Sequence, residues 1–135
     1  MRRIRVLGVG LLVALSLIAL QVAPGSSSKA PLPAVGLAFG LSCSPVLLFG
    51  FPSAQANLTN HLSQGVAIDV FFVWYDSADQ VVAVGARLGV DFAPGQTLNF
   101  YNTFLTPGAY IVKAFAQDQS GNALTFSCPV NVFVE

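Results

Sequence analysis

Few side chains in this chain have the types and spacing that chemistry requires. Among 135 residues there is one histidine, His61, and there are two cysteines, Cys43 and Cys128. A catalytic triad needs a nucleophile and an orienting acid beside its histidine, and the sequence contains no G-x-S-x-G nucleophile motif. One histidine and two distant cysteines also fall short of the ligands that hold a zinc ion. We therefore expect no catalytic residue, no metal and no cofactor, and a protein that is not an enzyme.

The aspartates and one asparagine predict turns and a modification site instead. Asp76 and Asp79 flank one predicted turn, and Asp118 begins another that ends at Asn122. Neither turn has the ligand series of a calcium loop, so we expect these residues to stabilise the turns themselves. Asn57 begins the tripeptide Asn-Leu-Thr, a sequon, and is a candidate glycosylation site if the chain is exported.

Residues 1–24 predict export. Three arginines within the first five residues precede an apolar run over residues 6–20, which is the pattern of a secretory signal peptide. If this segment is not cleaved, the apolar run extended to Ala23 is just long enough for a membrane anchor, with the arginines on the cytoplasmic side. Both alternatives place the rest of the chain outside the cytoplasm, secreted or at the cell surface, with membrane contact only through an uncleaved N-terminal segment.

Charge is scarce in the remainder of the chain. Charged residues make up 9% of the sequence, against about 25% in typical soluble domains. After residue 24 the basic residues are Lys29, Arg87 and Lys113, against six acidic residues. No basic patch is available to neutralise phosphates, so nucleic-acid binding is excluded.

The spacing of the apolar residues predicts an all-β domain. Residues 25–34 form a Gly/Ser/Pro-rich linker, and the sequence that follows shows short β-rich runs separated by Pro, Gly, Asp and Ser. We expect seven or eight antiparallel strands in a β-sandwich, with the first break after residue 51, at Phe51-Pro52-Ser53. The predicted core contains Trp74, Tyr110, Phe72, Val112, Leu98 and Phe126.

Residues 43–135 resemble an immunoglobulin-like domain of the fibronectin-III type. The segments FAPGQTLNF and TPGAYIVKAF, followed by a D-x-S-G-N hairpin, are similar to the C-terminal half of such a sandwich. Trp74 matches the buried tryptophan of strand C, and Tyr110 matches the tyrosine corner of strand F. The immunoglobulin B–F disulfide is absent, since Leu58 and Val112 stand near those positions.

Cys43 and Cys128 are predicted to form the one disulfide bond. Two thiols in an exported protein usually pair, and the first and last strands of a sandwich commonly lie side by side. The alternative is two buried free thiols.

Large apolar residues outnumber what one core face can bury. Alternation along residues 65–76 and 109–118 places some of them on the outer face of two neighbouring strands, where they would form one patch. This predicted interaction patch consists of Phe71, Val73, Tyr75, Ile111 and Phe115. A second possibility is that the linker or an N-terminal strand covers it.

Residues 35–42 alternate large and small side chains within the stretch AVGLAFGLS. Such a strand suits insertion into a groove, with Val35, Leu37, Phe39 and Leu41 on its large side. It either folds onto its own domain or completes the sandwich of a neighbouring copy, as a donor strand does.

The resulting hypothesis is a non-catalytic structural subunit of a cell-surface filament. Its partners would be copies of itself or other surface proteins, and it resembles the pilus and thread subunits of prokaryotic cell surfaces. The alternative is a membrane-anchored or secreted immunoglobulin-like module that binds protein or glycan.

Overall fold

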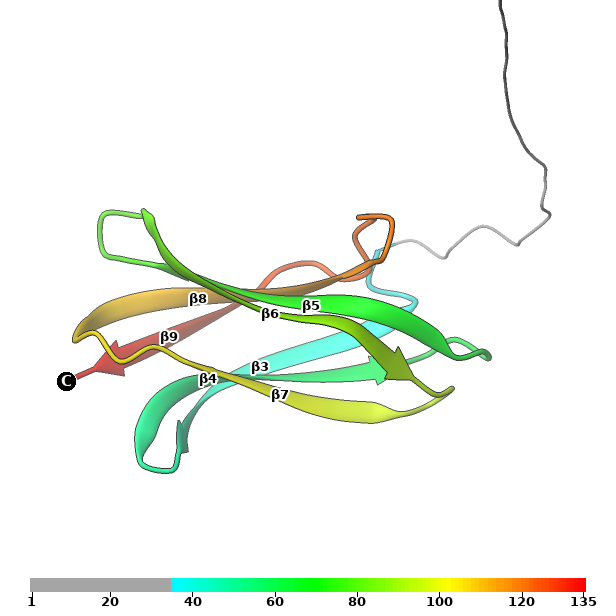
Figure 1. The fold of residues 1–135 in the computed structure, drawn as a ribbon, viewed down its shortest axis with the longest axis horizontal. Coiled ribbons are helices and arrows are strands. Elements are labelled where there is room, and N and C mark those ends of the chain that lie inside the picture. Colours follow the sequence, from blue (N-terminus) through cyan, green and yellow to red (C-terminus); the bar gives the residue numbers. More distant parts are fainter. Residues whose placement is uncertain (1–34) are drawn as a thin grey trace, which may run out of the picture. The chain divides into compact units, whose positions relative to one another are not determined.

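A computed structural model describes residues 35–135 of the chain (Figure 1). The predicted N-terminal hydrophobic helix, whether signal peptide (residues 1–24) or anchor, and the linker at 25–34 lie outside the described residues. Within residues 35–135 no helix is long and apolar enough to cross a membrane.

Seven strands in this region form two antiparallel sheets, which confirms the all-β prediction. They are β3 (Phe39–Leu48), β4 (Phe51–Asn60), β5 (Val66–Tyr75), β6 (Val81–Phe92), β7 (Thr97–Thr103), β8 (Gly108–Asp118) and β9 (Cys128–Val134). One sheet has the strand order β3-β4-β7 and the other has the order β6-β5-β8-β9. The two sheets form two layers, with the β3–β4 hairpin and the C-terminus at the same end (Figure 1).

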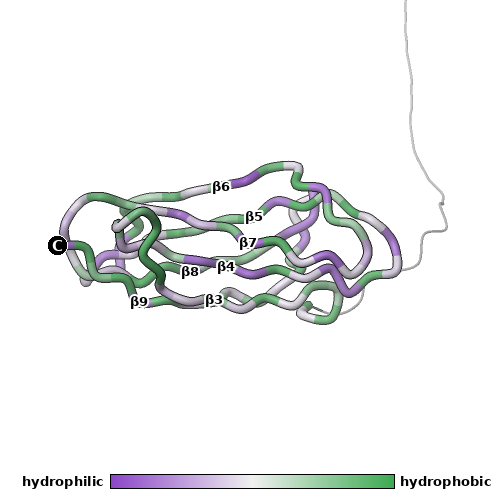
Figure 2. Tube along the Cα trace, turned by 90° about the horizontal axis from the view of Figure 1, so that it is seen from below, coloured by the Kyte–Doolittle hydropathy of each residue, from purple (hydrophilic) through white to green (hydrophobic). Residues whose placement is uncertain are grey.

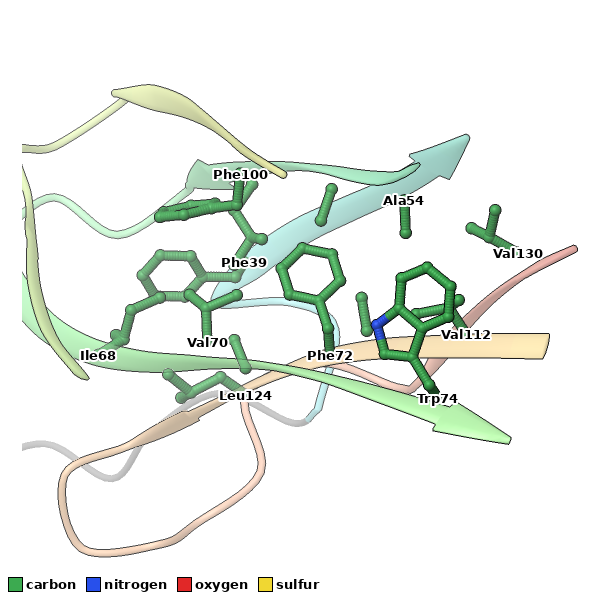
Figure 3. Close-up of a cluster of buried hydrophobic side chains, with 14 of the residues drawn as sticks. Phe39, Ala54, Ile68, Val70, Phe72, Trp74, Phe100, Val112, Leu124 and Val130 are labelled. Carbon is green, nitrogen blue, oxygen red and sulfur yellow. The ribbon is translucent and has the colours of Figure 1, made fainter. Parts of the chain in front are cut away.

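The core lies between the sheets because β5 alternates strictly between its two faces. Ile68, Val70, Phe72 and Trp74 are fully buried, and each intervening side chain points to the outer face. Figure 3 shows these side chains facing Phe39 and Phe100, which come from the other sheet. Period-two spacing is therefore the reason that β5 forms the centre of the sandwich.

Five of the six predicted core residues are in or against the core. Trp74, Phe72, Val112 and Tyr110 are buried, and Leu98 packs against them half-buried. Phe126 was predicted wrongly, because 73% of its surface is exposed. It lies before β9 begins, in an irregular stretch where Leu124 and Thr125 are buried instead. The Thr125 hydroxyl there accepts a hydrogen bond from the Ala116 amide at 3.0 Å, so strand alternation does not extend back to Phe126.

Two polar anchors fix the aromatic end of the core. The indole nitrogen of Trp74 donates to Asn102 Oδ1 on β7 at 2.7 Å. The hydroxyl of Tyr110, at the start of β8, donates to the Thr106 carbonyl at 2.8 Å. The Trp74 and Tyr110 rings meet edge to face with centroids 5.7 Å apart. Both aromatic residues thus bury their rings without leaving a polar atom unpaired.

Asn60, at the end of β4, is a fully buried polar residue whose role the sequence did not reveal. Its amide nitrogen donates to the carbonyls of Gln64 and Ala93 at 3.0 and 3.1 Å, and its Oδ1 accepts from the Leu62 amide at 2.8 Å. Buried polar groups are tolerated when they are hydrogen-bonded in this way. Asn60 therefore joins two loops at one end of the sandwich.

The first hairpin differs from the predicted one. The predicted break at Phe51-Pro52-Ser53 lies inside β4, and the chain reverses instead at Phe49-Gly50, where φ is 51° and 86°. Leu48 pairs with Phe51, so the loop has two residues with positive φ, as a type I′ turn requires. Phe49 stands at the tip with 93% of its surface exposed.

The predicted strand at residues 35–42 is corrected in its bounds and its place. Residues 35–38 form a turn, and β3 begins only at Phe39. Phe39 is buried in the core of its own chain, and Leu41 packs against that core. Both residues belong to the ladder with β4, where Phe39 lies opposite Asn60. Phe39, Leu41 and Cys43 therefore contribute to the core of their own sandwich. Among the large side chains of this stretch, only Val35 and Leu37 are exposed outside it.

Candidate interaction surface

The outer face of the four-stranded sheet brings together all five residues of the predicted interaction patch. Phe71 on β5 lies opposite Phe115 on β8, and Tyr75 lies opposite Ile111. The rings of Phe71 and Phe115 stack with centroids 5.3 Å apart and planes 21° from parallel. Val73 lies between Phe71 and Tyr75 on the same face. We call this outer surface of β6, β5, β8 and β9 the apolar face.

The apolar face extends beyond the predicted patch onto both edge strands. On β6, Val84 lies opposite Val73 and Val81 lies opposite Tyr75, and 61% of the Val84 surface is exposed. On β9, Phe133 lies opposite Ala109 and is 63% exposed. The alternation of β9 and the valines of β6 indicated exposed apolar residues on these strands. Only the pairing register, however, shows that they extend the patch on β5 and β8.

Charges on the apolar face are few: Lys113 and Asp69 are engaged in contacts, and Asp91 on β6 is exposed opposite Ala67. The Lys113 ammonium lies over the Tyr75 ring, 4.9 Å from its centroid, an arrangement that keeps the cation against an aromatic surface. Asp69 accepts a hydrogen bond from the Gly89 amide at 2.9 Å, at the irregular pairing of β5 with β6. The face is therefore large, aromatic and nearly uncharged, which monomeric proteins seldom expose.

The outer face of the three-stranded sheet is polar by contrast. Along one row Ser42 lies opposite Asn57, and Asn57 lies opposite Asn99. Gln55 Nε2 donates to Asn57 Oδ1 at 2.9 Å. Asn57 is half-buried near the middle of this face, and its glycosylation stays a prediction. The two outer faces thus differ sharply, and water contact suits only the polar one.

A groove opens at the end of the sandwich that carries the β3–β4 hairpin. Its volume is about 750 Å³, and apolar side chains of Leu47, Phe51, Leu105 and Phe133 line it. In Figure 2 strongly hydrophobic stretches of chain lie at this end, near the C-terminus, next to hydrophilic ones. A smaller hollow of about 410 Å³ shares residues 131–133 of β9 with it. Phe133 therefore belongs to both the groove and the apolar face.

The predicted disulfide between Cys43 and Cys128 is confirmed. It joins β3 to β9, one edge strand from each sheet, with Cα atoms 6.0 Å apart. Prolines lie on both strands, Pro45 on β3 and Pro129 on β9, as is common on edge strands. A disulfide of this kind is consistent with an extracytoplasmic location.

The titratable side chains of residues 35–135 do not group into a cluster of metal-ligating residues. His61 is exposed and lies against Gly40. Asp76 Oδ1 accepts from the amides of Ala78 and Gln80 at 2.9 and 3.0 Å, which confirms its predicted turn role. Within residues 35–135 no three His, Cys, Asp or Glu side chains group as metal ligands.

Asp118 occupies the second predicted turn in the same way. Its carboxylate accepts hydrogen bonds from the Ser120 amide, the Asn122 amide and the Asn122 side chain at 2.8–3.0 Å. These bonds, the one from the Asn122 side chain foremost, lower the pKa of Asp118 below its ordinary value. Its perturbed pKa thus follows from turn formation.

No protein-family model matches this sequence, and neither the curated proteins nor the solved structures contain a match. The fold and the surface define a disulfide-linked all-β protein of two antiparallel sheets with one apolar outer face. Its function is therefore inferred from its own residues and their geometry.

Proposed function

We propose that this protein is a non-catalytic, extracytoplasmic structural subunit that associates with copies of itself in a cell-surface filament. The observation that carries the proposal is the apolar face. Aromatic and aliphatic side chains cover the outer surface of one sheet, whereas the other sheet presents Ser, Asn, Gln and Thr to water. Burial of apolar area is the main driving force of association, and this face supplies such area with few charges to desolvate.

The proposed class is an immunoglobulin-like sandwich of the fibronectin-III type. Its support comes from the division into sheets β3-β4-β7 and β6-β5-β8-β9, from buried Trp74 on β5, and from Tyr110 at the start of β8. The Tyr110 hydroxyl bonds back to the Thr106 carbonyl, as a tyrosine corner does. Fold class alone carries no function, so the filament proposal depends on the surface.

Strand donation by residues 35–41 is not retained as the route of assembly. Phe39 is buried among its own core residues, so its withdrawal would open a cavity in the donor and cost about 3–5 kcal/mol. We place the contacts between copies on surfaces that are exposed in the folded sandwich instead.

Self-association of the full exported chain tests the proposal. We expect sedimentation velocity and negative-stain microscopy to show concentration-dependent linear assemblies. Val84→Glu places a carboxylate on the apolar face, opposite Val73 and without a basic residue opposite it, where its burial in a contact would cost several kcal/mol, and should weaken assembly at least 100-fold. Asn99→Glu is the matched control, because it puts the same charge on the polar outer face.

Both variants should unfold within a few degrees of wild type, since each altered side chain points away from the core. A chain that stays monomeric at all attainable concentrations contradicts the filament proposal. Such a result, together with binding of another protein or a glycan that Val84→Glu abolishes, would favour the anchored or secreted binding module.

A further inference from the structure

The groove at the hairpin end has the chemistry of a site for a proline-containing segment. Phe51 and Phe133 border it, with Pro45 and Pro52 beside them. Its volume of about 750 Å³ lies within the range of about 300–1,000 Å³ that binding pockets show. Grooves with aromatic walls recognise extended proline-rich segments, because such segments lose little conformational entropy on binding.

The chain itself contains a matching segment just before the sandwich. Residues 29–34 read KAPLPA, in which Pro31 and Pro33 flank Leu32. Proline favours the extended polyproline conformation in itself and in the residue before it. Lys29 is the only Lys, Arg, Asp or Glu between Arg5 and Asp69, and Glu135 is the only such residue that lines the groove. The basic segment and the acidic residue of the groove are therefore complementary in charge.

Geometry prevents a chain from placing this segment in its own groove. The described chain begins before Phe39, whereas the groove is lined by residues around Leu47, at the far end of the ten-residue strand β3. Pro45, the first groove residue on β3, is six residues past Phe39, or about 20 Å at about 3.3 Å per residue. Leu32 lies three residues before Val35 and so reaches at most about 11 Å from it, at up to about 3.6 Å per residue. This limit on chain length does not apply to residues 29–34 of a neighbouring copy.

We infer that the groove of one copy binds residues 29–34 of the next copy, with Leu32 among the groove side chains and Lys29 beside Glu135. This inference rests on the proposed function and names the contact that joins its subunits. Because the segment and the groove are different surfaces of one chain, the contact is heterologous, and the start of the described chain lies at the end of the sandwich away from the groove (Figure 1). Copies joined in this way form a linear array, and contacts between apolar faces supply the further association energy that the filament requires.

Photo-crosslinking of the full chain tests the contact directly. A benzophenone amino acid replaces Leu32, and the exported protein is mixed with uniformly ¹⁵N-labelled chains before irradiation. We expect mass spectrometry to find crosslinks between light and heavy chains that map to Phe51, Leu105 or Phe133. Crosslinks within one chain only, crosslinks that map elsewhere, or a mature N-terminus after residue 34 would overturn the inference.

Charge reversal supplies a second, independent readout. Lys29→Glu and Glu135→Lys should each raise the concentration of half-maximal assembly by about two- to five-fold, the range of an exposed ion pair, and the double variant should restore it. Leu105→Asp should weaken assembly at least ten-fold, whereas Leu37→Asp should not, because Leu37 is a comparably exposed leucine in the turn before β3, outside both the groove and the apolar face.

Equal effects of Leu105→Asp and Leu37→Asp, or a double variant no better than the single ones, would also count against the groove. Wild-type protein that assembles while its crosslinks map elsewhere refutes this inference and leaves the proposed function standing. Wild-type protein that never assembles refutes the proposed function, and the inference with it.

Discussion

Reduction of the Cys43–Cys128 bond should remove a large part of the stability of the sandwich. The bond connects positions 85 residues apart. The chain-entropy model assigns a loop of that length about 4.6 kcal/mol, because the bond removes open conformations from the unfolded chain. Small domains of roughly 100 residues have unfolding free energies of about 5–15 kcal/mol in total. The reduced protein should therefore be marginally stable.

Urea unfolding of the oxidised and the reduced full chain measures this effect without changing a side chain. With an m value of about 1–3 kcal/mol per molar, the midpoint should fall by about 1.5–4.5 M on reduction. The double variant Cys43→Ala, Cys128→Ala is the control, and it should match the reduced protein to within about 1 kcal/mol. A fall of less than about 0.5 M with an unchanged m value would show that the bond does not constrain the unfolded state as reasoned.

Two further perturbations test particular contacts. Gly85 lies opposite Phe72, and a Cβ added there would collide with the Asn102 amide. Gly85→Ala should therefore break the hydrogen bond from Trp74, cost about 1–3 kcal/mol and shift the fluorescence of this single tryptophan; an unchanged spectrum and stability would contradict it. Asp118 has a lowered pKa in the folded chain, so it stabilises the fold above its unfolded pKa of about 3.9, and this contribution is lost as the pH falls through the folded pKa. The difference in unfolding free energy between wild type and Asp118→Ala should accordingly shrink from pH 6 to pH 2.5, and a constant difference would disprove the link.

The sequence alone determined the all-β class and much of the core. Alternation in residues 65–76 is strong enough to place Phe72 and Trp74 inside and Phe71 and Tyr75 outside, because period two leaves no other assignment in a strand. The turns at Asp76 and Asp118 were equally predictable, since their short side chains form hydrogen bonds within a few residues of themselves. The disulfide followed from there being only two cysteines in a chain whose N-terminal sequence predicts export.

Only the tertiary structure decided which surfaces stay exposed, because exposure depends on segments far apart in the sequence. Phe39 lies in its own core because β3 pairs with β4 of the same chain, whereas its local pattern is equally compatible with donation to a neighbour. Phe126 points outward because the irregular stretch before β9 ends the alternation. The groove between the β3–β4 hairpin and the end of β9 has no local signature, since its walls come from residues 45–53, Leu105 and 131–135. The local side-chain pattern thus specifies on which side of a strand each residue lies, and the pairing of strands far apart in the sequence decides which residues that side contacts.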